Sequence, residues 1–335
     1  MAVRSGEIVD PDRPAGGYVY GPVPSRRLGR SLGVDLVPYK TCTYDCVYCQ
    51  LGRTTCKTIE RREYVSIDAV LAELERKLAV AKRPDYVGLA GSGEPTLNSG
   101  IGRLITALKA LTDVPIAVIT NGSLLWSEQV RGELAAADLV LPSLDAGDEQ
   151  MFERVNRPDP TIKFDMMVDG LAAFAARFRG ETWLEVMLLA GLTDSAAEVE
   201  KIAASARVIS PTCVQLNTAS RPAVEDFAHP SSRERMAALA RSFSGPVDII
   251  GGFVADADRA DAADAAADAA ADAEILALLA RRPCSAHDIA AGLGLHTLHV
   301  VKHLDLLLAA RQIRTISSGE KTYYAPAAPG ETPPS

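Results

Sequence analysis

A regular alternation of two kinds of segment limits the fold more than any other property of this sequence. Short β-branched runs alternate with longer amphipathic stretches from about Ser31 onward, a pattern typical of a parallel sheet covered by helices. The predicted strands are Leu32–Val37, Tyr86–Ala90, Ile116–Thr120, Leu139–Ser143, Trp183–Leu189 and Cys213–Asn217. The predicted helices are Ser66–Lys82, Ile101–Ala110, Ser127–Ala137, Phe164–Phe178 and Ser195–Ile209, with Ser66 and Ser195 as N-caps. Six such units predict an α/β fold, a partial (β/α)6 TIM-type barrel.

The acidic charge of the chain is concentrated in one segment. Of the formal net charge of −8 over 335 residues, −6 falls between Asp256 and Glu274, which hold six Asp, one Glu and one Arg. The remainder carries only −2, so the net charge excludes no class of partner, nucleic acid included. The segment 255–273 is almost entirely Ala and Asp, which predicts a linker, helical or partly disordered. On a helix it would present one solvated acidic face, made of Asp261, Asp264, Asp268 and Asp272.

A different layout follows this linker. Helical patterns at Glu274–Arg281, Ala286–Ala291 and Thr297–Ala310 precede two short strands, Ile313–Ile316 and Thr322–Ala325. Three helices and a β-hairpin predict a winged helix-turn-helix. The predicted domains are a flexible N-terminus over 1–17, a barrel over 18–254, the linker over 255–273, the winged helix-turn-helix over 274–326 and a flexible tail over 327–335.

The ends and the composition of the chain bear on its location. The N-terminal residues include Asp10, Pro11 and Asp12 where a signal peptide would need an apolar stretch. No run of about 18 apolar residues occurs, so we expect a soluble cytoplasmic protein with no membrane partner. Hydrophobic residues make up 47% and aromatic residues 5% of the chain, which suits an aliphatic α/β enzyme core. Because thiols stay reduced in the cytoplasm, the six cysteines are expected to be reduced thiols that bind metal and not disulfides.

Three of these cysteines lie within eight residues. Cys42, Cys46 and Cys49 supply thiolates at spacings of four and three, directly after a predicted strand. A closed structural site would use four protein ligands, whereas three cysteines on a [4Fe–4S] cluster leave one iron open for another molecule. The alternatives are three coincidental buried thiols, or a zinc site completed by a distant residue such as Cys56.

This C-x3-C-x2-C motif, with the aromatic Tyr48 before its last cysteine, resembles the signature of the radical S-adenosylmethionine (SAM) superfamily. The resemblance extends over about residues 18–250. It implies a [4Fe–4S] cluster on Cys42, Cys46 and Cys49, and SAM bound to the open iron. It further implies reductive cleavage of SAM to a 5′-deoxyadenosyl radical, which removes hydrogen from a substrate, and a reducing partner such as flavodoxin or ferredoxin. The substrate stays open, with RNA and a peptide as candidates, and no substrate-specific catalytic residue is marked.

Further motifs follow predicted strands, at the end where such a barrel binds its ligands. Gly91-Ser92-Gly93-Glu94-Pro95-Thr96 is similar to the family's glycine–glutamate–proline motif, whose backbone contacts the SAM amino group. Taken alone, this turn and the turns that hold Asn121, Ser143 and Asp145 are also compatible with ordinary turn chemistry. The pocket is expected to be completed by Glu185, Met187, Leu188, Gln215 and Asn217. The cofactor-binding residues implied by the resemblance are Tyr48, Gly91, Gly93, Glu94, Pro95, Thr96, Asn121, Ser143, Asp145, Glu185 and Asn217.

Three segments resemble one branch of the superfamily: Tyr20–Asp35, Val155–Pro158 and Leu216–Pro222. They are similar to segments of the branch related to the tRNA wybutosine-synthesising enzymes, which build a tricyclic base on a guanosine of tRNA. Those enzymes carry additional N-terminal cysteines for a second cluster, whereas this chain has no cysteine before Cys42. The wybutosine reaction itself is therefore not implied.

Two groups of basic residues either flank the cavity mouth, where they would attract an anionic or nucleic-acid substrate, or are solvated surface charges. They are Arg26, Arg27, Arg30, Arg53, Lys57, Arg61 and Arg62. In the predicted winged helix, Thr297–Ala310 would enter a DNA groove, although residues 275–335 hold six Lys/Arg and four Asp/Glu, only +2. Contact with a protein is an equal alternative. His296, His299 and His303 share one stripe of this helix and are predicted to lie on its polar face, with a metal site as the alternative.

Three hypotheses follow. A radical SAM enzyme is favoured because the motifs agree in their positions. The second hypothesis is an iron–sulfur- or SAM-responsive DNA-binding regulator, which the weak basic charge of the last domain disfavours. The third is a non-catalytic zinc-stabilised protein, which would have no need of the motifs after Cys49.

Overall fold

The computed structural model describes residues 17–25, 27–80, 83–219, 223–250, 262–279, 283–293, 295–318 and 321–327. Among them, an eight-stranded sheet has the strand order β1-β2-β5-β6-β7-β8-β9-β10. Its neighbouring strands are parallel except for the antiparallel pair β1 and β2. The chain therefore has an α/β fold with a mostly parallel sheet.

The strands of this sheet are β1 (Val19–Ser25), β2 (Gly29–Asp35), β5 (Tyr86–Ala90), β6 (Ile116–Thr120), β7 (Leu139–Pro142), β8 (Glu181–Leu188), β9 (Cys213–Thr218) and β10 (Val247–Ile249). A separate parallel pair is formed by β3 (Thr41–Cys42) and β4 (Cys56–Lys57). The helices are α1 (Ile67–Val80), α2 (Ile101–Leu111), α3 (Glu128–Leu134), α4 (Glu149–Val155), α5 (Phe164–Ala175), α6 (Ala196–Ile209) and α7 (Arg233–Leu239). Short 3-10 turns cover Pro95–Leu97 and Ala240–Ser242.

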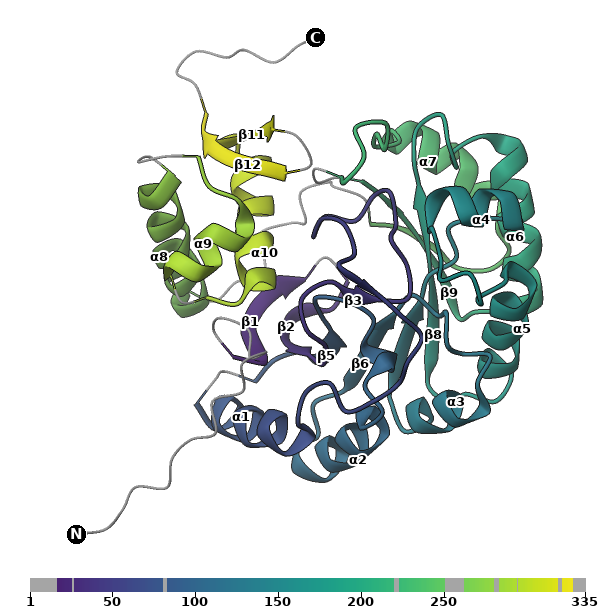
Figure 1. Ribbon diagram of the computed structural model, residues 1–335, viewed down its shortest axis with the longest axis horizontal. Helices are drawn as coiled ribbons and strands as arrows, with labels where there is room; N and C mark the ends of the chain where they lie inside the picture. Colours follow the sequence, from purple (N-terminus) through teal and green to yellow (C-terminus); the bar gives the residue numbers. More distant parts are fainter. Residues whose placement is uncertain are drawn as a thin grey trace.

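The helices form an arc around the outside of the sheet, and the segment that carries β3 lies inside this arc (Figure 1). The parallel strands bury both faces, which explains why they read as continuous aliphatic runs. In β8, Leu184, Val186 and Leu188 enter the main core shared with the helices, and the alternate residues point to the opposite face. Glu185 and Met187 of β8 therefore lie on the face of the sheet opposite the main core.

The six strands and five helices predicted for residues 18–254 are all present, with ends that agree or differ by up to three residues. The Ser195 side chain accepts a hydrogen bond from the Glu198 amide, which confirms this N-cap. Sequence analysis did not predict β1, α4, α7 or β10. The strand β1 contains Gly and two Pro residues, and β10 has only three residues, so neither shows a strand pattern.

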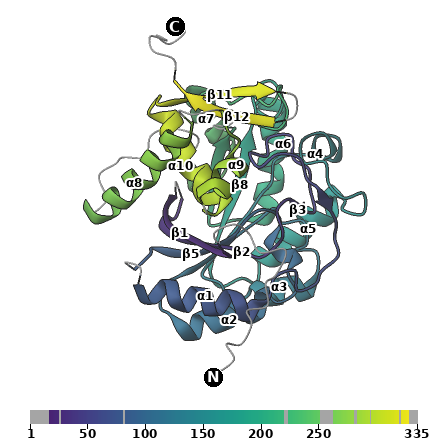
Figure 2. The same ribbon diagram turned by 60° about the vertical axis from the view of Figure 1, so that its left-hand side comes forward.

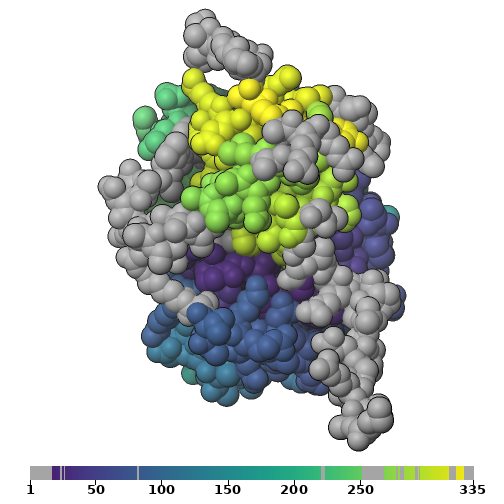
Figure 3. All heavy atoms as spheres, turned by 90° about the vertical axis from the view of Figure 1, so that its left-hand side faces the viewer, coloured from purple at the N-terminus to yellow at the C-terminus, as the bar shows by residue number. Residues whose placement is uncertain are grey.

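The C-terminal residues form a second unit with its own core. It contains α8 (Ala262–Leu279), α9 (Ala286–Leu293), α10 (Thr297–Ala309) and the antiparallel hairpin of β11 (Ile313–Ser318) and β12 (Lys321–Pro326). Its buried residues include Ile275, Ile289, Val300, Leu304 and Tyr324. Figures 2 and 3 show this unit lying against the first strands of the sheet, where α10 contacts β1. Between the two strands of the hairpin, residues 319–320 lie outside the described residues.

Two predictions about this region are wrong. The Ala/Asp-rich segment is helical from Ala262 to Leu279, which is one of its two predicted alternatives, but Asp268 and Asp272 do not form the predicted solvated stripe. Asp268 pairs with Arg30 of β2 at 2.8 Å, and Asp272 lies 2.8 Å from Nδ1 of His303. His303 and His296 are buried instead of lying on a polar face, because α8 and β1 pack against α10. Asp261 lies outside the described residues.

No helix in the described parts of the chain combines the length and the apolar character needed to cross a membrane.

Candidate functional site

The sheet brings the sequence motifs to one edge. Because β2, β5, β6 and β7 are parallel neighbours, their carboxyl ends meet on the same side. The cysteine segment follows β2, the glycine-rich turn follows β5, and Asn121 follows β6. Ser143 and Asp145 follow β7. This edge is where parallel α/β sheets bind ligands.

Each of the three predicted metal-binding cysteines is a free thiol with one side-chain N–H donor nearby. Nζ of Lys40 lies 3.0 Å from Sγ of Cys49. The side-chain amide nitrogen Nδ2 of Asn121 lies 3.6 Å from Sγ of Cys42. The corresponding nitrogen of Asn156 lies 3.6 Å from Sγ of Cys46. Donors of this kind stabilise thiolate ligands, and hydrogen bonds to the sulfurs are one of the factors that set the potential of an iron–sulfur cluster.

The surroundings of the thiols favour a bound metal over bare thiolates. Burial, followed by the charge of Glu94, raises the pKa of Cys42 to about 12. Burial and the charge of Asp145 raise the pKa of Cys46 well above its usual range. Among the described residues, no three His, Cys, Asp or Glu side chains meet around a single metal ion. A cluster makes a different demand, since each cysteine binds its own iron, and three thiols with one donor each fit that group.

The glycine-rich turn packs directly on the cysteine segment. A Cβ atom on Gly93 would lie 1.7 Å from the carbonyl oxygen of Thr41, and one on Gly91 would lie 2.2 Å from a carboxylate oxygen of Asp35. The Glu94 amide donates to the same Thr41 carbonyl at 3.1 Å, and the Lys40 amide donates to the Ser92 carbonyl at 2.7 Å. Only glycine allows this approach of two backbones.

Glu94 holds the turn from inside. Its buried carboxylate accepts hydrogen bonds from the Thr96 amide at 3.0 Å, the Thr120 hydroxyl at 2.6 Å and the Asn121 amide at 2.7 Å. Burial raises the pKa of Glu94, and these donors oppose the rise. Pro95 and Thr96, in the 3-10 turn, are buried beside it. The carboxylate therefore ties the end of β5 to the end of β6, and its two oxygens are occupied by protein donors.

Asp145 is the centre of a second buried network. It accepts hydrogen bonds from the Tyr48 hydroxyl, from the Asn156 amide group at 2.7 Å and from the Met187 backbone amide at 3.0 Å. Burial raises the pKa of Asp145 to about 6, against the effect of these donors. Since Tyr48 belongs to the cysteine segment and Asn156 donates toward Cys46, Asp145 positions that segment from the side of β7 and β8.

Glu185 and Asn217 meet in a third group, on the face of the sheet that the helices leave free. The Asn217 amide group donates to Oε1 of Glu185 at 2.6 Å, and the Arg27 guanidinium pairs with the same oxygen. Ser143 lies opposite Glu185 in a parallel bridge. Gln215 is also buried, and its Oε1 has no hydrogen-bond partner among the described residues.

The structure corrects the prediction for Leu188 and shows the partners of the basic residues. Leu188 lies fully buried in the main core on the helix side of the sheet, so it does not line the pocket. Most of the basic residues expected at the cavity mouth are paired with protein groups. Arg27, Arg30, Arg53 and Arg61 pair with Glu185, Asp268, Glu225 and Glu133, and Lys57 donates to the carbonyls of residues 157 and 158. Arg26 and residues 220–222 lie outside the described residues.

Sequence reasoning missed two contributors to the site, Lys40 and Asn156, which donate toward the cysteine sulfurs. Arg27, one of the basic residues expected at the cavity mouth, compensates Glu185. Lys40 had a local signal, since it lies two residues before the first cysteine. Asn156 lies in the segment Val155–Pro158, but the sequence assigned it no role, because the tertiary fold alone brings it to Cys46.

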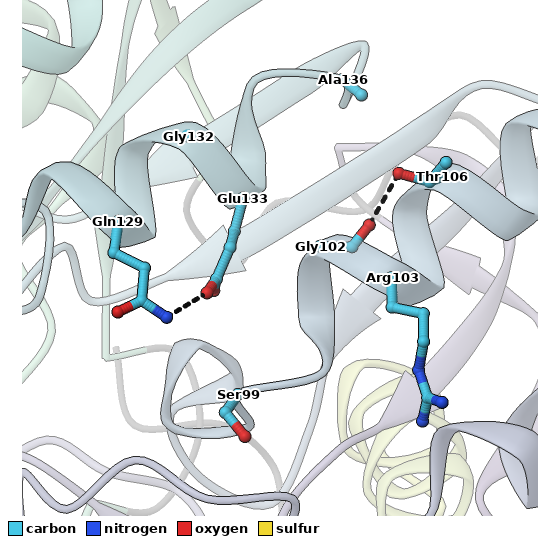
Figure 4. A pocket seen from close by; sticks show the side chains of 8 residues that line it. All are labelled: Ser99, Gly102, Arg103, Thr106, Gln129, Gly132, Glu133 and Ala136. Atoms are coloured by element: carbon cyan, nitrogen blue, oxygen red, sulfur yellow. Dashed lines mark hydrogen bonds between the residues drawn. The ribbon is translucent and has the colours of Figure 1, made fainter.

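A polar hollow of about 450 Å³ lies elsewhere, between α2 and α3. Figure 4 shows Gln129 and Glu133 on one side of it and Arg103 and Thr106 on the other. None of the predicted cofactor-binding residues lines it. This hollow is therefore separate from the candidate site.

Comparison with known proteins agrees with this geometry. The model of the radical SAM superfamily matches residues 36–203. The chain is 38% identical over 234 residues to a UPF0026 protein of Methanocaldococcus jannaschii. The aligned region covers 69% of this chain and 72% of that protein. The chain is also 38% identical over 296 residues to the protein named GTPase Obg of Brachyspira hyodysenteriae, which covers 88% of this chain but only 43% of that protein.

A solved structure shares the fold. The radical SAM methyltransferase from Sphaerobacter thermophilus superposes with a TM-score of 0.53 at 19% identity, over 69% of this chain and 68% of that one. At this identity the likeness concerns the fold alone. The chain belongs to the radical SAM superfamily and, by its similarity to the archaeal relative, to the UPF0026 proteins.

Proposed function

We propose that the protein is a radical SAM enzyme that binds a [4Fe–4S] cluster through Cys42, Cys46 and Cys49. The observation that carries this proposal is the matched set of three free thiols and three N–H donors, contributed by Lys40, Asn121 and Asn156. When bound and reduced, such a cluster cleaves SAM to a 5′-deoxyadenosyl radical, which removes a hydrogen atom from the substrate.

In this proposal the chain's own residues hold SAM against the cysteine segment. The backbone of Gly91 and Gly93 faces the SAM amino group, in a turn that Glu94, Pro95 and Thr96 keep fixed. Polar groups for the ribose and the carboxylate come from Asn121, Ser143, Asp145, Glu185 and Asn217, and Tyr48 lies beside them. The networks around Glu94 and Asp145 support these roles, because both are anchored before a ligand arrives.

The architecture that we propose is a partial (β/α)6 barrel followed by a winged helix-turn-helix. The arc of helices around β2, β5, β6, β7, β8 and β9 supports the first part. The order of three helices and a hairpin in residues 262–327 supports the second.

The substrate class that we propose to test first is RNA, beginning with tRNA, and a peptide is the second. The branch-like segments Tyr20–Asp35 and Val155–Pro158 support RNA. A small reducing protein such as flavodoxin or ferredoxin would supply the electron.

The arrangement of α10 favours the enzyme over the DNA-binding regulator. Thr297, Leu298, Val300 and Val301, in the first turns of α10, are buried. Leu298 packs with Tyr20 of β1, so this end of the helix is covered by the sheet domain. A recognition helix needs its first turns exposed to reach bases.

The test is anaerobic reconstitution with iron and sulfide, followed by a dithionite-driven assay for 5′-deoxyadenosine formed from SAM. We expect activity in the wild type and its loss in Cys46→Ala. Cys56→Ala is the matched control, because Cys56 is an exposed free thiol outside the motif and should keep full activity. A reconstituted cluster that never cleaves SAM, even with cell extract present, would contradict the proposal.

A further inference from the structure

The C-terminal unit inserts one side chain into the sheet domain. His296, at the start of α10, is 2% exposed and stacks on Tyr20 of β1 with ring centroids 4.4 Å apart. Its Nδ1 accepts a hydrogen bond from the Leu298 amide at 3.2 Å, so the residue also caps its own helix. With Nδ1 as the acceptor, Nε2 carries the ring proton.

That proton faces Asp35, at the carboxyl end of β2. Nε2 of His296 lies 3.3 Å from Oδ2 of Asp35, and neither side chain is exposed. The ring N–H is close to Asp35 but is not aligned for a hydrogen bond, and Nε2 has no hydrogen-bond partner among the described residues. Within the described part of the chain, His296 is the one basic side chain within 4.0 Å of this buried carboxylate. A buried carboxylate is costly without such compensation.

Asp35 in turn holds the glycine-rich turn. Its Oδ1 accepts from the Ser92 amide at 3.0 Å and its Oδ2 accepts from the Ser92 hydroxyl at 2.5 Å. The Ser92 carbonyl accepts from the amide of Lys40, whose side chain reaches Cys49. A line of contacts thus leads from α10, through a single carboxylate, to the turn that lies on the cysteine segment.

We propose that His296 is a positioning residue for SAM binding, supplied by the C-terminal unit and acting through Asp35 and Ser92 on the Gly91–Glu94 turn. This inference rests on the proposed function. It assigns the C-terminal unit a role within the same molecule: it completes the support of the turn from outside the sheet domain. His296 itself touches neither cofactor.

Two substitutions separate this role from helix capping. In His296→Asn, the side-chain oxygen preserves a good N-cap, but the short side chain cannot reach Asp35. In His296→Gln, the amide nitrogen reaches about as far as Nε2, but the residue is a poor cap. A positioning role predicts a defect in His296→Asn and rescue in His296→Gln, whereas a capping role predicts the reverse.

The first readout is hydrogen exchange of the backbone amides of residues 91–94 and 96 in the full chain without a cluster. We expect exchange about tenfold faster in His296→Asn, the lower end for a lost contact to a charged group, and a rate within about twofold of wild type in His296→Gln. Exchange in α5, far along the chain, should stay unchanged in both. Wild-type exchange in His296→Asn, a larger defect in His296→Gln, or faster exchange in α5 as well would each overturn the positioning role.

The second readout is the KM for SAM in the reconstituted enzyme. His296→Asn should raise this KM about tenfold while kcat stays within about twofold, because the turn is loosened and the chemistry is untouched. A fall in kcat at unchanged KM would overturn the inference. If the wild type forms no 5′-deoxyadenosine, the proposed function fails, and the exchange measurement still decides the role of His296.

Discussion

The ammonium nitrogen of Lys40 lies 3.0 Å from the sulfur of Cys49, and Lys40 is itself buried. A positive charge at this position favours the reduced, more negative state of a cluster bound to the thiols. We therefore expect Lys40→Met to lower the midpoint potential of the reconstituted cluster, on the order of 100 mV for a unit charge a few ångströms away at an effective dielectric constant near 20. Redox titration monitored by electron paramagnetic resonance measures this. Lys40→Arg keeps the charge and should stay near wild type, and equal potentials in the wild type and Lys40→Met would contradict the assignment.

Glu94 should be sensitive to the loss of its charge. In Glu94→Gln, an amide group replaces one of the oxygens that now accept from Thr120 and the Asn121 amide, so a donor faces a donor. We expect the free energy of unfolding to fall by about 2 kcal/mol. Urea titration of the protein without a cluster gives this value. Glu75→Gln, at an exposed position of α1, is the control and should change it by less than about 0.5 kcal/mol.

Two glycines should respond to alanine in opposite ways. Gly132, in α3, has no atom within 4 Å of the position of an added Cβ and borders the hollow of Figure 4. Gly132→Ala should therefore stabilise the protein by about 0.5–1 kcal/mol.

In Gly93→Ala the methyl would meet the Thr41 carbonyl, so we expect lower stability and less iron bound after reconstitution. Thermal unfolding and iron analysis test both, and normal iron content in Gly93→Ala would show that the contact is dispensable.

The stability of the protein should decrease in mild acid through His299. Burial, then the charges of His303 and Lys77, lower the pKa of His299 to about 4. The unfolded imidazole titrates near 6.5, so the native state binds this proton less tightly than the unfolded chain. The stability that follows from this difference in the pKa of His299 is fully present above pH 6.5, and it is lost as the pH falls from 6.5 toward 4. It amounts to roughly 2–3 kcal/mol between pH 7.5 and 4.5.

Urea unfolding of the wild type and of His299→Gln at both pH values tests this effect. The substitution should reduce the pH dependence by about the amount given above, because the other titrating groups are common to both chains. An identical pH dependence in the two proteins would show that His299 does not carry it.

The fold was predictable from the sequence where local patterns and tertiary structure agree. The aliphatic runs at Tyr86–Ala90 and Ile116–Thr120 became strands with the predicted ends, since burial on both faces demands such residues. The strand β1 was not predictable, because Gly21, Pro22 and Pro24 break the pattern and only its pairing with β2 defines it.

The candidate site was predictable to the extent that its groups lie in consecutive motifs. Cys42 and Gly93 belong to such motifs, and the parallel sheet places them together. The partners of these groups were not predictable. Asn156 follows α4, which sequence analysis missed, and His296 was predicted for a polar face yet is buried beside Asp35. A one-dimensional pattern records the faces of a helix but not which other element covers them.

The close approach of Gly93 to Thr41 has a thermodynamic consequence. The glycine-rich turn and the cysteine segment touch backbone to backbone, with no space for a methyl group between them, so neither can be displaced alone. A ligand that immobilises one of them therefore reduces the conformational entropy that a ligand of the other must overcome. Two ligands at this edge of the sheet are expected to bind with positive cooperativity, and by reciprocity each strengthens the other by the same factor.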